Sequence, residues 1–199
     1  MKVLIVGATG AIGSVVAQAL DERKHDVVRV GRTSGDLQVD ITSDSSVDAM
    51  YAQIGRVDAI VSAAGGLFLG PLPKMLPADF NVGLQSKLLG QVRLALLGQH
   101  MLNDGGSITL TTGIDEPIRQ GANAMAVNAA VEGFVRGAAI ELPRGLRINA
   151  VSPTVLLESL SSYGPFFPGF DAVPAARVAQ AYVRSVEGPQ TGRIYCVWQ

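Results

Sequence analysis

The sequence predicts a single doubly wound α/β domain over residues 1–199, a parallel sheet covered by helices on both faces in three layers. Apolar runs of strand length alternate with segments of helical periodicity, which is typical of this fold class. The first run, Lys2–Val6, leads directly into three glycines, Gly7, Gly10 and Gly13, with Gly-x-x-Gly-x-x-Gly spacing. No repeat, linker or low-complexity segment divides the chain, so we expect one domain.

The elements follow from local patterns taken in chain order. Lys2–Val6 is expected to be a strand, because parallel strands buried on both faces have continuous apolar side chains. A helix over Ala11–Lys24 and a second strand over Val27–Val30 come next. Only Gly-Arg-Thr-Ser-Gly-Asp separates that strand from the short run Leu37–Asp40, so no crossover helix fits and the sheet edge is trimmed. The other strands are expected at Ala59–Ala63, Ser107–Thr111, Arg147–Val151 and Arg193–Val197, and the other helices at Ser46–Ile54, Ser86–Leu102, Ala124–Leu142 and Ala175–Val186.

The glycine turn has the features of a diphosphate site. Gly7 allows a tight turn off the strand, Gly10 lets backbone N–H groups approach an anion, and Gly13 lets the helix lie close to the strand. The helix N-terminus adds free N–H donors and partial positive charge. With Thr9 and Ile12, these glycines are the expected pyrophosphate-binding residues of a dinucleotide cofactor, and the alternative is an ordinary strand-to-helix turn.

The end of the second strand favours NADP over NAD. An acidic residue at this place in the fold binds the ribose 2′-hydroxyl of NAD, whereas an arginine accommodates the 2′-phosphate of NADP. Here the strand runs into Gly31-Arg32-Thr33-Ser34. Arg32 can bind a phosphate in a bidentate way and Thr33 can add a hydroxyl. NAD remains the alternative cofactor because of Asp36, since a flexible loop could bring its carboxylate to the ribose.

Composition excludes several classes of function. The net charge of −1, without a basic run, gives no electrostatic reason to bind nucleic acid. No stretch has the length of a membrane span, and a single cysteine, Cys196, excludes an internal disulfide and a multi-cysteine metal site. Motifs of hydrolases, nucleoside triphosphatases and zinc enzymes are missing. We therefore expect a cytoplasmic protein with a small-molecule substrate, no metal and solvated histidines at His25 and His100.

Two of the expected helices, Ser86–Leu102 and Ala124–Leu142, are apolar on more than one face. A helix of this kind is buried on more than one side. One side is expected to pack on the sheet and the other on a second subunit, which predicts a homodimer or homotetramer.

Several short motifs occur in a fixed order along the chain. They are Val6–Gly13, Val39-Asp-Ile-Thr42, Gly55-Arg-Val-Asp58, Ser62-Ala-Ala-Gly65, Gly106-Ser-Ile-Thr109, Gly133-Phe134, Glu141-Leu142 and Arg147–Pro153. With this order and spacing the chain resembles the short-chain dehydrogenase/reductase family over nearly its whole length. The resemblance implies a Rossmann-like fold and NAD(P)-dependent oxidoreductase activity. The chain is similar to a compact, divergent branch of that family.

The resemblance also implies particular cofactor-binding positions. Asp40 and Ile41 match the residues that contact adenine, and Pro153 precedes the loop through Val155 that contacts nicotinamide. The family's Asn-Asn-Ala-Gly turn corresponds to Ser62, Ala63, Ala64 and Gly65, so serine and alanine stand where asparagines are usual. Thr154 stands where the family has glycine.

The catalytic residues of the family are not at their usual places. Counting from Gly133-Phe134, the tyrosine position falls on Ala124 and the lysine position on Asn128. The asparagine position falls on Lys87, and the serine position on Gly113, next to Thr112. Lys87, Thr112 and Asn128 are therefore the candidate catalytic residues.

The source of the proton is left open by the residues. Lys87 could act as the acid, or it could hold the nicotinamide ribose. Tyr163, in an aromatic, Gly/Pro-rich, lid-like segment at about 154–174, could close over the site, or its aromatic neighbours could only line an apolar pocket. The expected function is an NADP(H)-dependent oxidoreductase acting on a small, fairly apolar carbonyl or alcohol. The alternative is a catalytically silent NADP-binding protein, such as a redox sensor or an interaction module.

Overall fold

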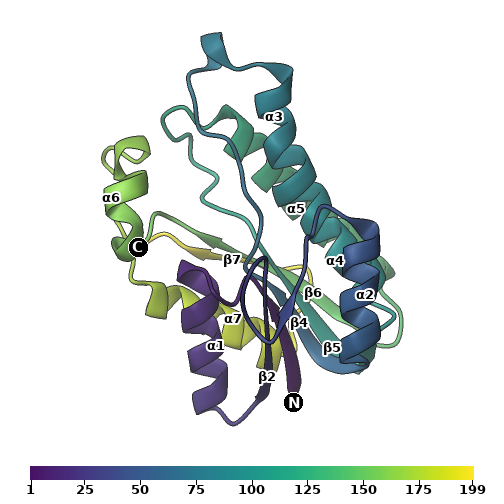
Figure 1. Ribbon diagram of the computed structural model, residues 1–199. Coiled ribbons are helices and arrows are strands. Elements are labelled where there is room, and N and C mark those ends of the chain that lie inside the picture. Colours follow the sequence, from purple (N-terminus) through teal and green to yellow (C-terminus); the bar gives the residue numbers. More distant parts are fainter.

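The computed structural model describes residues 1–199 and contains one seven-stranded parallel sheet with the strand order β3-β2-β1-β4-β5-β6-β7 (Figure 1). The predicted fold class is confirmed. The strands are β1 Lys2–Val6, β2 Asp26–Gly31, β3 Leu37–Gln38, β4 Val57–Ser62, β5 Leu102–Thr111, β6 Arg147–Pro153 and β7 Ile194–Val197. The helices are α1 Ala11–Glu22, α2 Asp44–Ile54, α3 Pro77–Gly83, α4 Gln91–Gly98, α5 Ala122–Glu141, α6 Leu160–Tyr163 and α7 Ala175–Glu187.

The sheet is buried between two helical layers. Successive side chains of a strand point to opposite faces, and β1 shows how this divides the core. Val3 and Ile5 pack with α1 and α7, whereas Leu4 and Val6 pack with α2, α4 and α5. The same two layers lie on either side of the sheet in Figure 1. Both faces of β1 are therefore apolar, which explains why its sequence shows no alternation.

The trimmed edge predicted after the second strand is present. β3 consists of Leu37 and Gln38 alone, and it pairs with Val30 and Gly31 at the end of β2. No helix lies between the two strands. The loop that carries Arg32 is therefore short and stays close to the carboxyl end of β2.

The helix predicted over Ser86–Leu102 is wrong at both ends. The helical segment begins at Pro77 and runs through a π-helical turn, Leu84–Gly90, before α4 ends at Gly98. Pro77 is the first helical residue, and the Asp79 carboxylate accepts a hydrogen bond from the Leu76 N–H at 2.9 Å. Proline at this position and an acidic cap are start signals, and they place the beginning nine residues before the apolar stripe. At the other end, Leu102 belongs to β5.

The lid-like segment folds into short pieces. A 3-10 turn at Leu157–Ser159, α6 and a second 3-10 turn at Gly164–Phe166 follow one another. The segment then returns to its starting point, where Leu156 pairs with Val173. None of the helices in the molecule combines the length and the apolar character needed to cross a membrane.

Candidate active site

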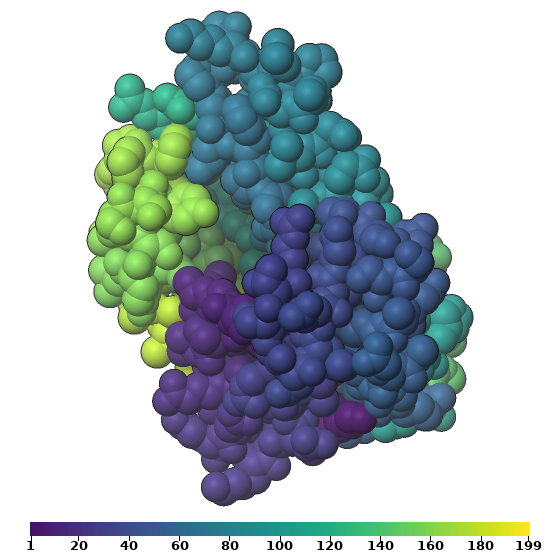
Figure 2. Space-filling view, in the orientation of Figure 1, coloured from purple at the N-terminus to yellow at the C-terminus, as the bar shows by residue number.

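A cleft runs across the carboxyl end of the sheet, where ligands bind in doubly wound folds. It consists of an outer cavity of about 650 Å³ beside the glycine turn and an inner cavity of about 590 Å³. Both are lined by Ala63, Ala64, Gly65 and Gly66, so the two cavities are continuous. In the space-filling view the molecule is hollowed between the green segment around residue 160 and the blue and teal segments of the first half (Figure 2).

The glycine turn is packed so closely that side chains do not fit. A Cβ on Gly7 would lie 2.6 Å from the Ala63 carbonyl oxygen, and the φ of Gly7 is +87°. A Cβ on Gly13 would lie 2.0 Å from the Gly7 carbonyl oxygen. Helix α1 begins at Ala11 without a side-chain cap, so its first N–H groups are left for an anion. Gly7 and Gly13 therefore allow the tight turn and the close approach of helix to strand that the sequence predicts.

Most of the predicted cofactor residues line the cleft. In the outer cavity these are Gly7, Thr9, Gly10, Arg32, Asp40 and Ile41; in the inner cavity they are Ile12, Pro153 and Val155; Ala63, Ala64 and Gly65 line both. Gly13 lies behind the turn, where it permits the close approach just described. Thr33 is exposed and does not line either cavity, and its carbonyl accepts a hydrogen bond from Gln38.

Arg32 and Asp36 differ in what surrounds them. Arg32 lines the outer cavity, is exposed, and forms no ion pair with another residue. Asp36 is turned back toward β2, where its carboxylate accepts a hydrogen bond from the Arg29 N–H at 2.8 Å. The Arg32 guanidinium is thus free at the cleft. The Asp36 carboxylate, which was the reason to consider NAD as an alternative cofactor, already has a partner.

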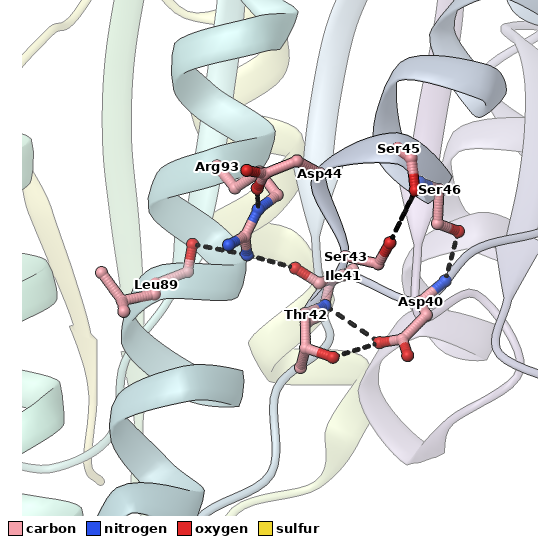
Figure 3. A network of polar contacts seen from close by, with 9 residues as sticks. All are labelled: Asp40, Ile41, Thr42, Ser43, Asp44, Ser45, Ser46, Leu89 and Arg93. Atoms are coloured by element: carbon pink, nitrogen blue, oxygen red, sulfur yellow. Dashed lines mark hydrogen bonds and ion pairs between the residues drawn. The ribbon is translucent and has the colours of Figure 1, made fainter.

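The wall that carries Asp40 and Ile41 is held in place by α4 (Figure 3). Arg93 donates to the Ile41 carbonyl oxygen at 2.6 Å and forms an ion pair with Asp44. The Thr42 hydroxyl and N–H both donate to the Asp40 carboxylate, which keeps the pKa of that carboxyl below its usual range. These bonds fix the backbone at the position that the resemblance assigns to adenine.

The structure brings Lys87, Thr112 and Asn128 together at the inner cavity. Lys87 comes from the π-helical turn, Thr112 follows β5, and Asn128 lies on α5. Lys87 is 7% exposed, and burial lowers the pKa of its ammonium from 10.5 to about 8. Ala124, one turn before Asn128, also lines the cavity and offers no hydroxyl.

Two polar atoms at the inner cavity have no partner within the protein. The Asn128 Oδ1 and the Thr154 Oγ1 are buried and make no hydrogen bond. Buried polar atoms of this kind are rare in proteins and point to a ligand or an ordered water. Thr112 is different, since its hydroxyl donates to the buried Glu132 carboxylate at 3.3 Å.

Two residues of this region were not singled out from the sequence. Gln91 is fully buried and bonds to both Lys87 and Thr111, and Glu132 lies behind Thr112. A glutamine inside an apolar helical run was the available signal for Gln91. For Glu132 the signal was an acid one turn after Asn128 on the same helix.

The rest of the inner cavity is mostly apolar. Side chains from the loops after β4 and β5, from α5 and from the lid-like segment form its walls: Leu67, Leu69, Ile114, Ile118, Met125, Leu156, Phe166 and Phe167. Tyr163 lines the same cavity and is 48% exposed. The Phe166 carbonyl accepts a hydrogen bond from the Arg119 N–H, which ties the segment to the loop before α5.

Comparison with known proteins shows which family has this fold and this cleft. A family model described as Enoyl-(Acyl carrier protein) reductase matches residues 6–191. The chain belongs to the short-chain dehydrogenase/reductase family. Among the relatives in this family, D-threitol dehydrogenase of Mycolicibacterium smegmatis is 27% identical over 210 residues, 88% of this chain and 79% of that protein. L-xylulose reductase of Homo sapiens is 25% identical over 178 residues, 80% of this chain and 73% of that protein.

Two solved structures superpose over almost the whole chain. The protein lin1944 from Listeria innocua is 53% identical, with a TM-score of 0.97 and full coverage of both chains. A small-chain dehydrogenase in complex with NADPH is 26% identical, with a TM-score of 0.89, and the match covers 99% of this chain and 96% of that one. The fold of this chain therefore matches these two solved structures over almost its whole length.

Proposed function

We propose that this chain is an NADP(H)-dependent oxidoreductase that interconverts a small, fairly apolar carbonyl compound and its alcohol. The observation that carries the proposal is the free Arg32 guanidinium at one end of a continuous cleft whose other end holds Lys87. One end suits a phosphorylated ribose, and the other suits a carbonyl oxygen. The chain would act as one domain, with residues 154–174 as its lid.

The residues of the outer cavity fit NADP. Uncapped N–H groups of α1 and the close backbone approach at Gly7 suit a pyrophosphate. Arg32 would bind the 2′-phosphate, because a guanidinium presents paired donors to a phosphate group. Asp36, engaged with the Arg29 N–H, would not compete for a ribose hydroxyl. A relative solved with NADPH bound supports the same choice.

Carbonyl reduction needs a hydride and a proton, and NADPH supplies the hydride when bound. The chain supplies the proton, and we assign this to the Lys87 ammonium. Lys87 Nζ–H⁺ would transfer its proton to the substrate oxygen and become a neutral amine, which solvent then reprotonates. A pKa of about 8 suits such an acid at neutral pH. Asn128 and Thr112 would orient the substrate oxygen and the amine.

The substrate class follows from the walls of the inner cavity. Apolar and aromatic side chains surround Lys87, and apart from Lys87 only Tyr163 in the lining is titratable. The named relatives act on polyols and sugars according to their names. The lining described here favours a carbonyl compound that is less hydroxylated than those, bound with its oxygen toward Lys87.

The expected homodimer or homotetramer remains part of the proposal. Leu96 and Ile140, on α4 and α5, are 50% and 87% exposed, and a groove of about 340 Å³ lies between these helices. Exposed apolar side chains beside a groove mark an association surface. We assign this surface to a second copy of the chain. The cytoplasmic location expected from the sequence stays a prediction.

Cofactor binding and turnover test the proposal together. Arg32→Ala is expected to weaken NADPH binding by about 10- to 100-fold, because a charged hydrogen bond is lost, and to change NADH binding by less than about 3-fold. Arg177→Ala, an exposed arginine outside the cleft, serves as the control and should leave both affinities unchanged.

A panel of aliphatic and aromatic aldehydes and ketones, with NADPH absorbance as the signal, tests turnover. Oxidation of NADPH with at least one member is the expected result. Tight NADPH binding without turnover of any member would instead favour the catalytically silent alternative.

A further inference from the structure

The helix that carries Lys87 is interrupted at that residue. Residues Leu84–Gly90 form a π-helical turn between α3 and α4. Such turns are rare inside helices and occur frequently at functional sites. In a regular α-helix the Gln91 N–H would donate to the Lys87 carbonyl, but here it donates to the Leu88 carbonyl. The side chain of Gln91 takes over that bond, since its Nε2 donates to the Lys87 carbonyl oxygen at 2.9 Å.

The same side chain also binds the end of β5. The Gln91 Nε2 donates to the Thr111 carbonyl oxygen at 2.8 Å, and the Gln91 Oε1 accepts from the Thr111 N–H at 2.8 Å. One amide thus pairs with both the N–H and the carbonyl of Thr111, as a residue of a neighbouring strand would. Gln91 is fully buried, so water does not compete for these bonds. The residue that follows Thr111 is the candidate Thr112.

Lys87 depends on this backbone for its position. Its ammonium has no carboxylate or carbonyl partner, and desolvation alone accounts for its lowered pKa. The side chain passes Gly65, where a Cβ would lie 3.1 Å from the Lys87 Cδ. The Glu132 carboxylate accepts hydrogen bonds from Thr112 and Arg136 instead. The turn and the wall at Gly65 therefore determine where the ammonium lies.

We propose that Gln91 is a positioning residue, which ties the turn of Lys87 to the end of β5 and so sets where the Lys87 ammonium meets the substrate oxygen. The inference rests on the proposed function in one respect, the role of Lys87 as proton donor. Displacements of about 1 Å in a reacting group can cost about 100-fold in rate, so a fixed turn matters for the chemistry.

Gln91→Met removes all three bonds while keeping the length of the side chain. It is expected to lower kcat by about 10-fold or more, with the Kd of NADPH within about 2-fold of wild type. Gln91→Asn, which retains an amide but cannot reach both partners, should give a smaller loss and serves if the first variant folds poorly. Gln53→Met is the control, because Gln53 is exposed on α2 and lies outside the cleft.

If Gln91 only stabilised the fold, its replacement would leave the pKa of Lys87 unchanged. The chain has only the lysines Lys2, Lys24, Lys74 and Lys87, so NMR of isotope-labelled lysine side chains can follow each one, with Lys87→Met for assignment. In Gln91→Met the pKa of Lys87 should rise from about 8 toward 10.5, as the turn relaxes and admits water. An unchanged titration of Lys87 in both Gln91 variants overturns the proposal.

A double-mutant cycle supplies the second criterion. If Gln91 acts through Lys87, the loss of kcat in Gln91→Met should vanish in a Lys87→Met background. An equal loss in both backgrounds contradicts the proposal. The titration needs no turnover, so an inactive wild-type protein whose Lys87 pKa still responds to Gln91 would refute the proposed function and leave the positioning intact.

Discussion

Gly65 and Lys87 pack closely together in the lining of the inner cavity. A Cβ on Gly65 would lie 2.9 Å from the Lys87 Cα, and Gly65 has a φ of +121°. Gly65→Ala is therefore expected to displace the Lys87 turn and to lower kcat by about 10-fold or more. Backbone strain should also reduce the free energy of unfolding by about 1 kcal/mol.

Gly55→Ala is the matched control for this change. Gly55 also has a positive φ, +68°, but a Cβ there would meet nothing within 4 Å. It should reduce stability in a similar way and leave kcat unchanged. A wild-type kcat in Gly65→Ala, measured beside this control, would contradict the contact.

The pH dependence of carbonyl reduction should follow Lys87. Its ammonium must carry the proton, and burial places its pKa at about 8, so kcat should fall as pH rises through about 8. Lys87→Met should remove this limb and slow reduction by about 10²- to 10⁴-fold, the usual contribution of general acid catalysis. Steady-state kinetics from pH 6 to 10 measure both.

Tyr163→Phe separates Lys87 from the alternative donor. Tyr163 lines the cavity but is half exposed, so this variant should retain the rate and the pH limb of the wild type. If Lys87→Met keeps full turnover and only weakens NADPH binding, Lys87 holds the ribose and is not the acid.

An ion-pair cluster joins the end of α7 to the turn after α1. Glu187 accepts hydrogen bonds from Arg23 at 2.6 Å and from His25 at 2.9 Å, which lower the pKa of its carboxyl from 4.5 to about 2. The His25 side chain is only 9% exposed, so the expected solvated histidine was wrong at this position. The His25 ring lies between the turn after α1 and the end of α7.

The sign of this shift predicts how stability responds to acid. A carboxyl with a lowered folded-state pKa stabilises the protein above its unfolded value of about 4.5, and the stabilisation is lost as pH falls toward about 2. The thermal midpoint of the wild type should therefore fall more steeply over this range than that of Glu187→Gln. Glu116→Gln, an exposed loop carboxylate, should follow the wild type. Parallel curves for all three proteins would contradict the prediction.

The face of α4 and α5 should govern assembly. Leu96→Asp places a charge beside the groove between these helices and is expected to convert the oligomer to monomer in sedimentation velocity experiments. Leu72→Asp, on a leucine before α3 that is 66% exposed, should not change the oligomer. A monomeric wild type at micromolar concentration would exclude the proposed interface.

The sheet and the glycine turn were predictable because they depend on local signals. Continuous apolar runs such as Lys2–Val6 are typical of buried parallel strands, and the glycine spacing corresponds to contacts of Gly7 and Gly13 that exclude a Cβ. The trimmed edge could be read from the number of residues between β2 and β3. None of these features requires knowledge of distant contacts.

The inner cavity was only partly predictable. Lys87, Thr112 and Asn128 were found by alignment of motifs, and the structure brings them to one cavity. The π-helical turn has no periodic signature in the sequence, and the bonds from Gln91 to Thr111 join residues twenty positions apart. α3 was missed because it is short and its start depends on Pro77 and Asp79 rather than on an apolar stripe.

The π-helical turn at Leu84–Gly90 also bears on how this site could be altered. Such a turn accommodates one more residue than the α-helical turn it replaces. Removing one residue from it would restore a regular helix and rotate Lys87 relative to the cleft, while α4 could keep its own contacts with the sheet. The insertion or deletion of a single codon could therefore change the position of Lys87 while the packing of α4 is kept. A lineage could gain or lose the lysine site in this way without rebuilding the fold.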